Sequence, residues 1–449
     1  MEQALPIVAA ALVVAAYCFA SRPLERHAIT APLVMTVAGL ILGRGGADVF
    51  PPLGSSLVRT LAEVTLVLVL FADASRIKIG SLRREGGLPI RLLLIGLPLT
   101  ILFGTGAGLV LLPALGVAGA ALLASILAPT DAALGQATVS DPSVPERVRQ
   151  TLNVESGLND GIALPAVLFF AALTAPEAAE VTHRDGLGWT GFVASQLLLG
   201  PLAGGVIGFA GGKAAQMARE REWVTDTYSA ITALAIAALA YTGAEMVGGN
   251  GFIAAFVAGL AFGHSSAKPG DFVSEFTESE GQVLILIAFL VFGATLLPDA
   301  LARAEPVHLV YALFSLTLVR MVPVALALLG AGVKPATGLF IGWFGPRGLA
   351  TILYVVIVVE DFARDPEGTV AVVASLTAAV SIVLHGVSAS PLSELYGRSL
   401  GGQAAPEEAK RIQPSPVRVF AKPMRPDADT APDASMAEEP APGDGNTAH

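Results

Sequence analysis

The sequence predicts an all-α polytopic membrane protein of about 13 transmembrane helices, arranged as two inverted six-helix repeats that each contain a broken helix. Three observations lead to this prediction: an apolar composition, a regular series of apolar windows, and two polar breaks at equivalent places. Of the 449 residues, 53% are hydrophobic and 14% are charged, and the mean hydropathy is +0.67. A soluble domain carries about 25% charged residues. We therefore expect an integral membrane protein and not an enzyme.

Thirteen windows are apolar, and crossing a bilayer takes about 17–25 residues. They cover about 5–20, 29–43, 57–74, 88–112, 116–139, 151–174, 187–211, 223–244, 247–263, 277–298, 307–331, 333–359 and 368–393. The first window has no Lys or Arg before it, so we interpret it as the first span and not as a cleaved signal. The single cysteine, Cys18, excludes a disulfide framework and a thiolate metal cluster.

The loops after odd-numbered spans carry most of the basic residues. These are Arg22, Arg26, Arg76, Lys78, Arg83, Arg84, Arg91, Arg147, Arg149, Lys213, Arg219, Arg221, Lys268 and Lys334. Basic loops face the cytoplasm, which predicts an outside N-terminus and a cytoplasmic C-terminus. Beyond a transmembrane domain over 1–395, residues 396–449 read as a disordered cytoplasmic tail, either regulatory or without function. This tail contributes much of the net charge of −10, and we expect no nucleic-acid partner.

The fifth window is interrupted by Pro129-Thr130-Asp131. Proline has no backbone N–H and clashes with the preceding turn, so we expect the helix to break here. At membrane depth, such backbone is tolerated only inside protein or beside a water-filled cavity. A freed carbonyl, the Thr130 hydroxyl and the Asp131 carboxylate together form an oxygen set that suits a hard monovalent cation. The alternative is a proline kink at which Asp131 caps the second half-helix, and that role is compatible with ion binding.

The sixth window carries a polar cluster of Glu155, Ser156, Asn159 and Asp160. At about 100° per residue these side chains share one side of a helix, and Ser156 and Asp160 can bind the same ion. Charged side chains at membrane depth are costly and mark function, so Asp160 is the best candidate for the group that exchanges a proton for a cation. For Glu155 we favour a structural ion pair with Arg320, in the eleventh window, over a role in transport.

The twelfth window contains a second break, Gly345-Pro346-Arg347-Gly348. The fifth and twelfth windows hold equivalent places in two halves, about 5–174 and 223–393, and the single span between the halves makes them inverted. Paired broken helices indicate a secondary-transporter site at the membrane midplane. Asp131 would balance the positive ends of the half-helices and Arg347 the negative ends. The alternative is that Arg347 extends to a membrane interface.

Other polar residues lie within or beside the apolar windows. Asp73, at the end of the third window, is either an interfacial residue beside Arg76 or an auxiliary carboxylate of the site. The remaining ones are interpreted as packing or turn residues: Glu63, His264, His385 and Asn250-Gly251.

Three motifs occur in a fixed order along the chain. They are Pro129-Thr130-Asp131, residues 155–161 (Glu-Ser-Gly-Leu-Asn-Asp-Gly) and residues 342–348 (Gly-Trp-Phe-Gly-Pro-Arg-Gly), supported by residues 251–260 and 384–388. This set resembles the motifs of monovalent cation:proton antiporters of the NhaP-like sodium/proton exchanger family. The resemblance covers about residues 5–395, so residues 1–395 are expected to form the antiporter domain.

The resemblance implies the NhaA/NhaP-like antiporter fold with crossed broken helices, and a multi-pass homodimer in a bacterial-type plasma (inner) membrane. It implies exchange of Na⁺, or Li⁺, for H⁺ by alternating access, without a cofactor, in pH and sodium homeostasis. The cation would be held by Asp160, Ser156 and the Thr130 backbone, with Asp131 close by. Glu155 and Arg320 map onto an ion pair of similar proteins. The Asn159-Asp160 pair resembles that of electroneutral members, which exchange one cation for one proton.

The sequence leaves other functions open. A K⁺/H⁺ antiporter of the same fold is the nearest alternative, because selectivity depends on cavity geometry, which residue spacing does not determine. A transport-dead sensor or a channel is a second alternative, against which the intact Asp160 and Asp131 argue. An intramembrane aspartyl protease is disfavoured, since its Tyr-Asp and Gly-x-Gly-Asp settings do not occur in the sequence.

Overall fold

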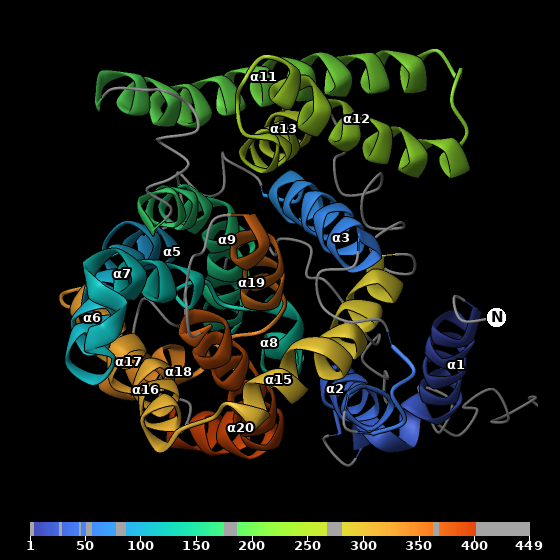
Figure 1. The fold of residues 1–449 in the computed structure, drawn as a ribbon. Coiled ribbons are helices and arrows are strands. Elements are labelled where there is room, and N and C mark those ends of the chain that lie inside the picture. Colours follow the sequence, from blue (N-terminus) through green and yellow to red (C-terminus); the bar gives the residue numbers. More distant parts are fainter. Residues whose placement is uncertain are drawn as a thin grey trace, which may run out of the picture.

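The computed structural model describes residues 4–26, 29–44, 46–50, 56–77, 87–174, 186–266, 281–361 and 368–400 (Figure 1). Every regular element in these ranges is helical, which confirms the all-α prediction. Helix α20 (Thr369–Leu400) continues past the predicted domain boundary at residue 395. Residues 401–449 of the predicted tail lie outside the described residues.

Within the described ranges, seven helices are long and apolar enough to cross a membrane. They are Leu5–Leu24, Gly87–Leu111, Glu146–Thr174, Leu197–Glu220, Gly281–Ala302, Pro306–Ala327 and Thr369–Leu400. Shorter apolar helices cover Ala31–Leu42, Pro113–Ile126, Ile231–Met246 and Gly251–Ser265. These helices overlap the predicted windows, and the count of thirteen spans stays a prediction.

The first half of the chain contains the first predicted break. Its elements are α1 (Ala4–Arg26), α2 (Ala31–Leu42), α3 (Ser56–Ser75), α5 (Gly87–Arg91), η1 (Leu92–Gly96), α6 (Leu97–Leu111), η2 (Pro113–Leu115), α7 (Gly116–Ile126), α8 (Ala132–Ser140) and α9 (Glu146–Thr174). The π-helical η1 joins α5 and α6 into one span. Helices α7 and α8 are separated by residues 127–131, which confirms that the fifth span breaks around Pro129.

The second half contains the matching break. Its elements are α11 (Gly186–Glu220), α12 (Asp226–Met246), α13 (Gly251–Ser265), η3 (Phe292–Leu296), α15 (Leu297–Ala302), α16 (Pro306–Leu316), α17 (Leu318–Ala327), α18 (Pro335–Trp343), α19 (Leu349–Asp361) and α20. Residues 344–348 separate α18 from α19, as predicted. An interruption that was not predicted separates α16 from α17 at Thr317, whose hydroxyl donates to the Leu313 carbonyl at 2.6 Å. Such back-bonding bends helices.

The helices form two groups (Figure 1). We call α5–α9 and α16–α20 the core group, because these helices carry both breaks. The outer group comprises α1–α3, the span Gly281–Ala302 and α11–α13. Within the outer group α13 packs on α3 and α11, while α3 also contacts α9 and α19 of the core group. The third span therefore lies where the two groups meet.

Glycines allow a close helix contact in the outer group. Helix α11 carries Gly200, Gly204, Gly208 and Gly212 at intervals of four residues. A Cβ at Gly204 or Gly208 would collide with the backbone of α13, at Ala254 or Ala258. Small residues at this spacing let helix backbones approach in membranes, where packing replaces the hydrophobic effect as the driving force. The α11–α13 contact therefore depends on these glycines.

We expect Gly204→Ala to destabilise the protein, because its methyl group would overlap the Ala254 backbone. Overpacking of this kind costs about 1–3 kcal/mol. The measurement is the melting temperature of the purified protein in detergent. The matched control is Gly205→Ala on the same helix, whose Cβ would meet only the Val257 side chain at 3.8 Å. Equal melting temperatures for the two variants would contradict the backbone contact.

Candidate ion-binding site

The two broken spans touch each other at their breaks. The backbone N–H of Asp131, in the break between α7 and α8, donates to the Pro346 carbonyl, in the break between α18 and α19, at 2.8 Å. Asp131 is 5% exposed. Backbone groups that have left their helices are thus satisfied across the crossing, as a water-poor interior requires.

The Asp131 carboxylate caps two half-helices at once. Its Oδ1 accepts from the Leu134 N–H of α8 at 3.4 Å, and its Oδ2 accepts a short hydrogen bond from the Leu349 N–H of α19. A negative charge is stabilising at a helix N-terminus, and here it serves two. A Cβ at Gly348 would collide with Asp131 Oδ2, so glycine is needed at that position. The capping role anticipated for α8 therefore extends to α19.

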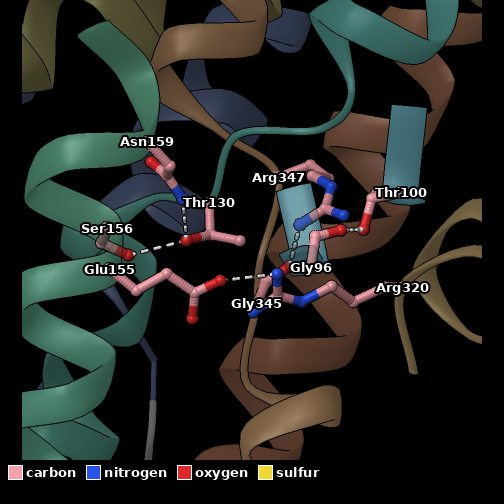
Figure 2. A network of polar contacts seen from close by, with 9 residues as sticks. All are labelled: Gly96, Thr100, Thr130, Glu155, Ser156, Asn159, Arg320, Gly345 and Arg347. Atoms are coloured by element: carbon pink, nitrogen blue, oxygen red, sulfur yellow. Dashed lines mark hydrogen bonds and ion pairs between the residues drawn. The ribbon is translucent and has the colours of Figure 1, made fainter. Parts of the chain in front are cut away.

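Cationic and polar side chains bind the backbone of the second break. Arg347 is fully buried, and its Nη1 donates to the Gly345 carbonyl at 2.5 Å (Figure 2). The Arg347 backbone N–H donates to Ser381 Oγ of α20 at 2.7 Å. A buried Arg347 does not fit the alternative of a side chain that extends to a membrane interface.

His385 of α20 also holds this break. Its Nε2 donates to the Trp343 carbonyl at 2.9 Å, and its Nδ1 lies 3.1 Å from Ser381 Oγ. The ring stacks on the Trp343 indole with centroids 5.2 Å apart. The sequence predicts only a packing or turn role for His385. The available signal was a lone histidine four residues after a serine in an otherwise apolar helix, but only the tertiary structure shows which carbonyl it meets.

Thr130 joins the first break to the polar cluster of α9. Its Oγ1 accepts from the Asn159 amide at 2.6 Å and lies 2.9 Å from Ser156 Oγ (Figure 2). All three side chains are buried. Asp160 follows Asn159 and is half-buried, and its backbone carbonyl accepts from the Tyr354 hydroxyl at 2.6 Å. The structure thus brings the side chains of Thr130, Ser156 and Asn159 together, and Asp160 is the next residue of α9.

Glu155 and Arg320 form an ion pair between α9 and α17. Arg320 Nη1 lies 2.6 Å from Glu155 Oε1, and the two side chains are 2% and 3% exposed (Figure 2). The Arg320 guanidinium packs against Gly345, where a Cβ would collide with it. The pair therefore lies beside the second break. With Arg347 and Asp131, the crossing holds two buried cations and two buried anions.

The other polar residues named from the sequence lie outside the crossing of the broken helices. Asp73 is half-buried in the last turn of α3, the outer-group helix that contacts α9. Glu63 forms an ion pair with Arg59 at 2.8 Å, and His264 is exposed at the end of α13. Asn250 caps α13 by accepting from the Ile253 N–H at 3.0 Å, which is a turn role.

Fold and site together define a polytopic membrane protein in which two broken helices cross beside a buried polar cluster, the architecture of a secondary transporter. The profile of the family described as sodium/hydrogen exchanger, transmembrane, matches residues 8–395. The chain belongs to this sodium/hydrogen exchanger family, as its motifs predicted.

Individual relatives differ in the cation their names give. The chain is 31% identical over 260 residues to Na⁺/H⁺ antiporter 2 of Zygosaccharomyces rouxii, covering 54% of this chain and 31% of the relative. It is 22% identical over 378 residues to the K⁺/H⁺ antiporter NhaP of Alkalimonas amylolytica, covering 84% and 64%. The chain thus spans about a third and just under two thirds of these relatives.

A solved structure supports the fold. The sodium proton antiporter MjNhaP1 from Methanocaldococcus jannaschii superposes with a TM-score of 0.71 at 21% identity. The match covers 88% of this chain and 99% of that chain. It agrees with the predicted NhaP-like fold class.

We expect Arg320→Ala to destabilise the protein strongly, because it leaves the Glu155 carboxylate buried without its cation. Breaking one partner of a buried pair costs about 3–5 kcal/mol. The measurement is the melting temperature of the purified protein. The double variant Glu155→Gln/Arg320→Met removes both charges, and we expect it to melt above the single variant. A single variant that melts like the wild type would show that the pair does not hold the fold.

Proposed function

We propose that this chain is a secondary antiporter that exchanges a monovalent cation for H⁺ by alternating access. The observation that carries the proposal is the Thr130 hydroxyl, held between Ser156 and Asn159 at the crossing of the broken helices. Asp160 follows Asn159 on α9, so its carboxylate would join the hydroxyls of Thr130 and Ser156 to bind a dehydrated cation. Membership of the sodium/hydrogen exchanger family supports the same activity.

Asp160 is the exchanging group in this mechanism. The four buried charges at the crossing balance, two cations against two anions, so the state of Asp160 decides the net charge beside the crossing. Asp160 binds either a proton or a cation, and never both. An uncompensated charge is costly at membrane depth, so the core group moves only when Asp160 is neutralised. The two fluxes are then coupled without further machinery.

The cation ligands are Asp160, Ser156 and Thr130. Asp131 lies in the same break as Thr130, and its carboxylate would lie close to the bound cation. Asn159 tunes the site as a donor to Thr130 without adding charge. Asp73 would serve as an auxiliary carboxylate on the outer-group side of α9.

Na⁺, with Li⁺, is the proposed substrate, and K⁺ is the second candidate because named relatives include antiporters for both ions. Exchange is proposed to be electroneutral, one cation for one proton, since Asn159 stands where a second carboxylate would add charge. The protein would be a homodimer in the plasma membrane with an outside N-terminus and a cytoplasmic C-terminus. Large apolar side chains exposed on α1, including Leu5, Leu12 and Phe19, provide a surface for lipid or a second copy.

We expect Asp160→Asn to abolish exchange, because the amide can neither release a proton nor neutralise a cation. The measurement is Na⁺-driven relief of a pH gradient in proteoliposomes, with the melting temperature as a check on folding. The control is Glu394→Gln, which removes an exposed carboxylate from α20 of the same core group. Full exchange by Asp160→Asn would exclude Asp160 as the coupling group.

We expect the exchange rate to be the same with and without a clamped membrane potential, because a one-for-one exchange moves no net charge. The assay compares Na⁺, Li⁺ and K⁺ in proteoliposomes with the wild-type protein. A rate that rises when the potential is clamped would contradict the one-for-one stoichiometry. The ranking of the three cations decides between Na⁺ and K⁺ as the substrate.

A further inference from the structure

Helix α19 is tied to three parts of the ion site within its first two turns. The Leu349 N–H donates to Asp131 Oδ2, and the Thr351 hydroxyl donates to the Ile126 carbonyl at 3.2 Å. The Tyr354 hydroxyl donates to the Asp160 carbonyl at 2.6 Å. Thr351 and Tyr354 are the hydroxyl side chains of α19, and a spacing of three places them on one face of the helix.

The first two bonds hold both ends of the fifth-span break. Ile126 is the last residue of α7, where a helix leaves carbonyls without intrahelical partners, and Thr351 satisfies this one. Asp131 stands just before α8 and is reached from the start of α19. The distance between the two half-helices is therefore set from α19 as well as by the chain that joins them.

The third bond fixes the residue that carries the exchanging carboxylate. Helix α9 is continuous through Asp160 and contains Pro165 five residues further on, so the Tyr354 hydroxyl binds α9 in the turn that precedes this proline. Tyr354 is 1% exposed, and its ring holds the hydroxyl in place between α19 and α9. What the bond fixes is the position of Asp160 relative to α19, and through α19 relative to the break that carries Thr130.

We propose that Thr351 and Tyr354 are positioning residues for the cation cage, which is the set of proposed ligands Asp160, Ser156 and Thr130. By setting the size of this cage they favour a Na⁺-sized ion over K⁺. This inference rests on the proposed antiport function. Neither side chain is a ligand of the ion. Thr351 acts through the Ile126 carbonyl, and Tyr354 acts through the Asp160 carbonyl. A smaller cation needs shorter distances to its oxygens, and selectivity follows from cavity size together with the field strength of its oxygens. The Thr130 hydrogen bonds hold the cage on the α9 side, and the α19 hydroxyls hold it from the opposite helix.

The test compares wild type, Tyr354→Phe, Thr351→Val and Thr351→Ser in proteoliposomes, with apparent KM and kcat measured for Na⁺, Li⁺ and K⁺. We expect Tyr354→Phe and Thr351→Val to raise the ratio of the Na⁺ KM to the K⁺ KM about threefold or more, with smaller changes in kcat. Thr351→Ser keeps the hydroxyl, so it should retain the wild-type ratio. The cation-induced rise in melting temperature, measured in detergent, reports the same ratio without transport.

The chain offers a matched control for each variant. Tyr311→Phe removes a buried hydroxyl that donates to the Gly104 carbonyl at 3.1 Å, between α16 and α6. Thr377→Val removes one that donates within α20, to the Val373 carbonyl at 2.7 Å. Both controls should keep the wild-type ratio of KM values.

The outcomes separate the inference from the proposed function. A wild type that exchanges cations, with an unchanged ratio in Tyr354→Phe and Thr351→Val, overturns the positioning role and leaves antiport in place. A control variant that shifts the ratio of KM values as much as the variant it is matched to also overturns the positioning role. A wild type that transports K⁺ but not Na⁺ overturns the Na⁺-sized cage. A wild type that exchanges none of the three cations overturns the proposed function and this inference with it.

Discussion

The structure depends on one constraint, which is that backbone groups freed by two helix breaks must find partners inside the membrane. Side chains at the crossing form hydrogen bonds with particular backbone atoms that the breaks leave free. Asp131 accepts from the N-termini of α8 and α19, His385 donates to the Trp343 carbonyl, and Thr351 donates to the Ile126 carbonyl. Because these side chains come from several helices, the core group is held as one unit around its irregular segments.

The same solution sets the electrostatics of the site. Capping two N-termini with a carboxylate places Asp131 in the interior, and Arg347 donates to the Gly345 carbonyl in the second break. The Glu155–Arg320 pair adds one charge of each sign. The four buried charges then sum to zero, which is why the proposed mechanism assigns the variable charge to one further carboxylate, Asp160. Glu155 has its charge committed to Arg320, which distinguishes it from Asp160 on the same helix.

The sequence predicted the features that depend on the chemistry of single residues. Pro129 and Pro346 reveal the two breaks because proline cannot continue a helix, and charged residues in apolar windows reveal Glu155, Asp160 and Arg320. Contacts that depend on which helix face meets which neighbour were not predicted. His385, Thr351 and Tyr354 look like ordinary residues of apolar helices until their acceptors are known. The interruption at Thr317 was also missed, since no proline or glycine marks it.

Helix α19 connects the ion cage to the movement that the proposed mechanism requires. Its face with Thr351 and Tyr354 is hydrogen-bonded to α7 and α9 inside the core group. Its other face, with Ile352, Leu353 and Val356, lines an apolar pocket together with Leu61 of α3 and Val291 of the Gly281–Ala302 span. Directional bonds resist displacement, whereas apolar contacts can be exchanged for similar ones as a helix slides. A helix fixed on the cage side and apolar on the outer side can therefore move against α3 while the oxygens around the cation keep their spacing.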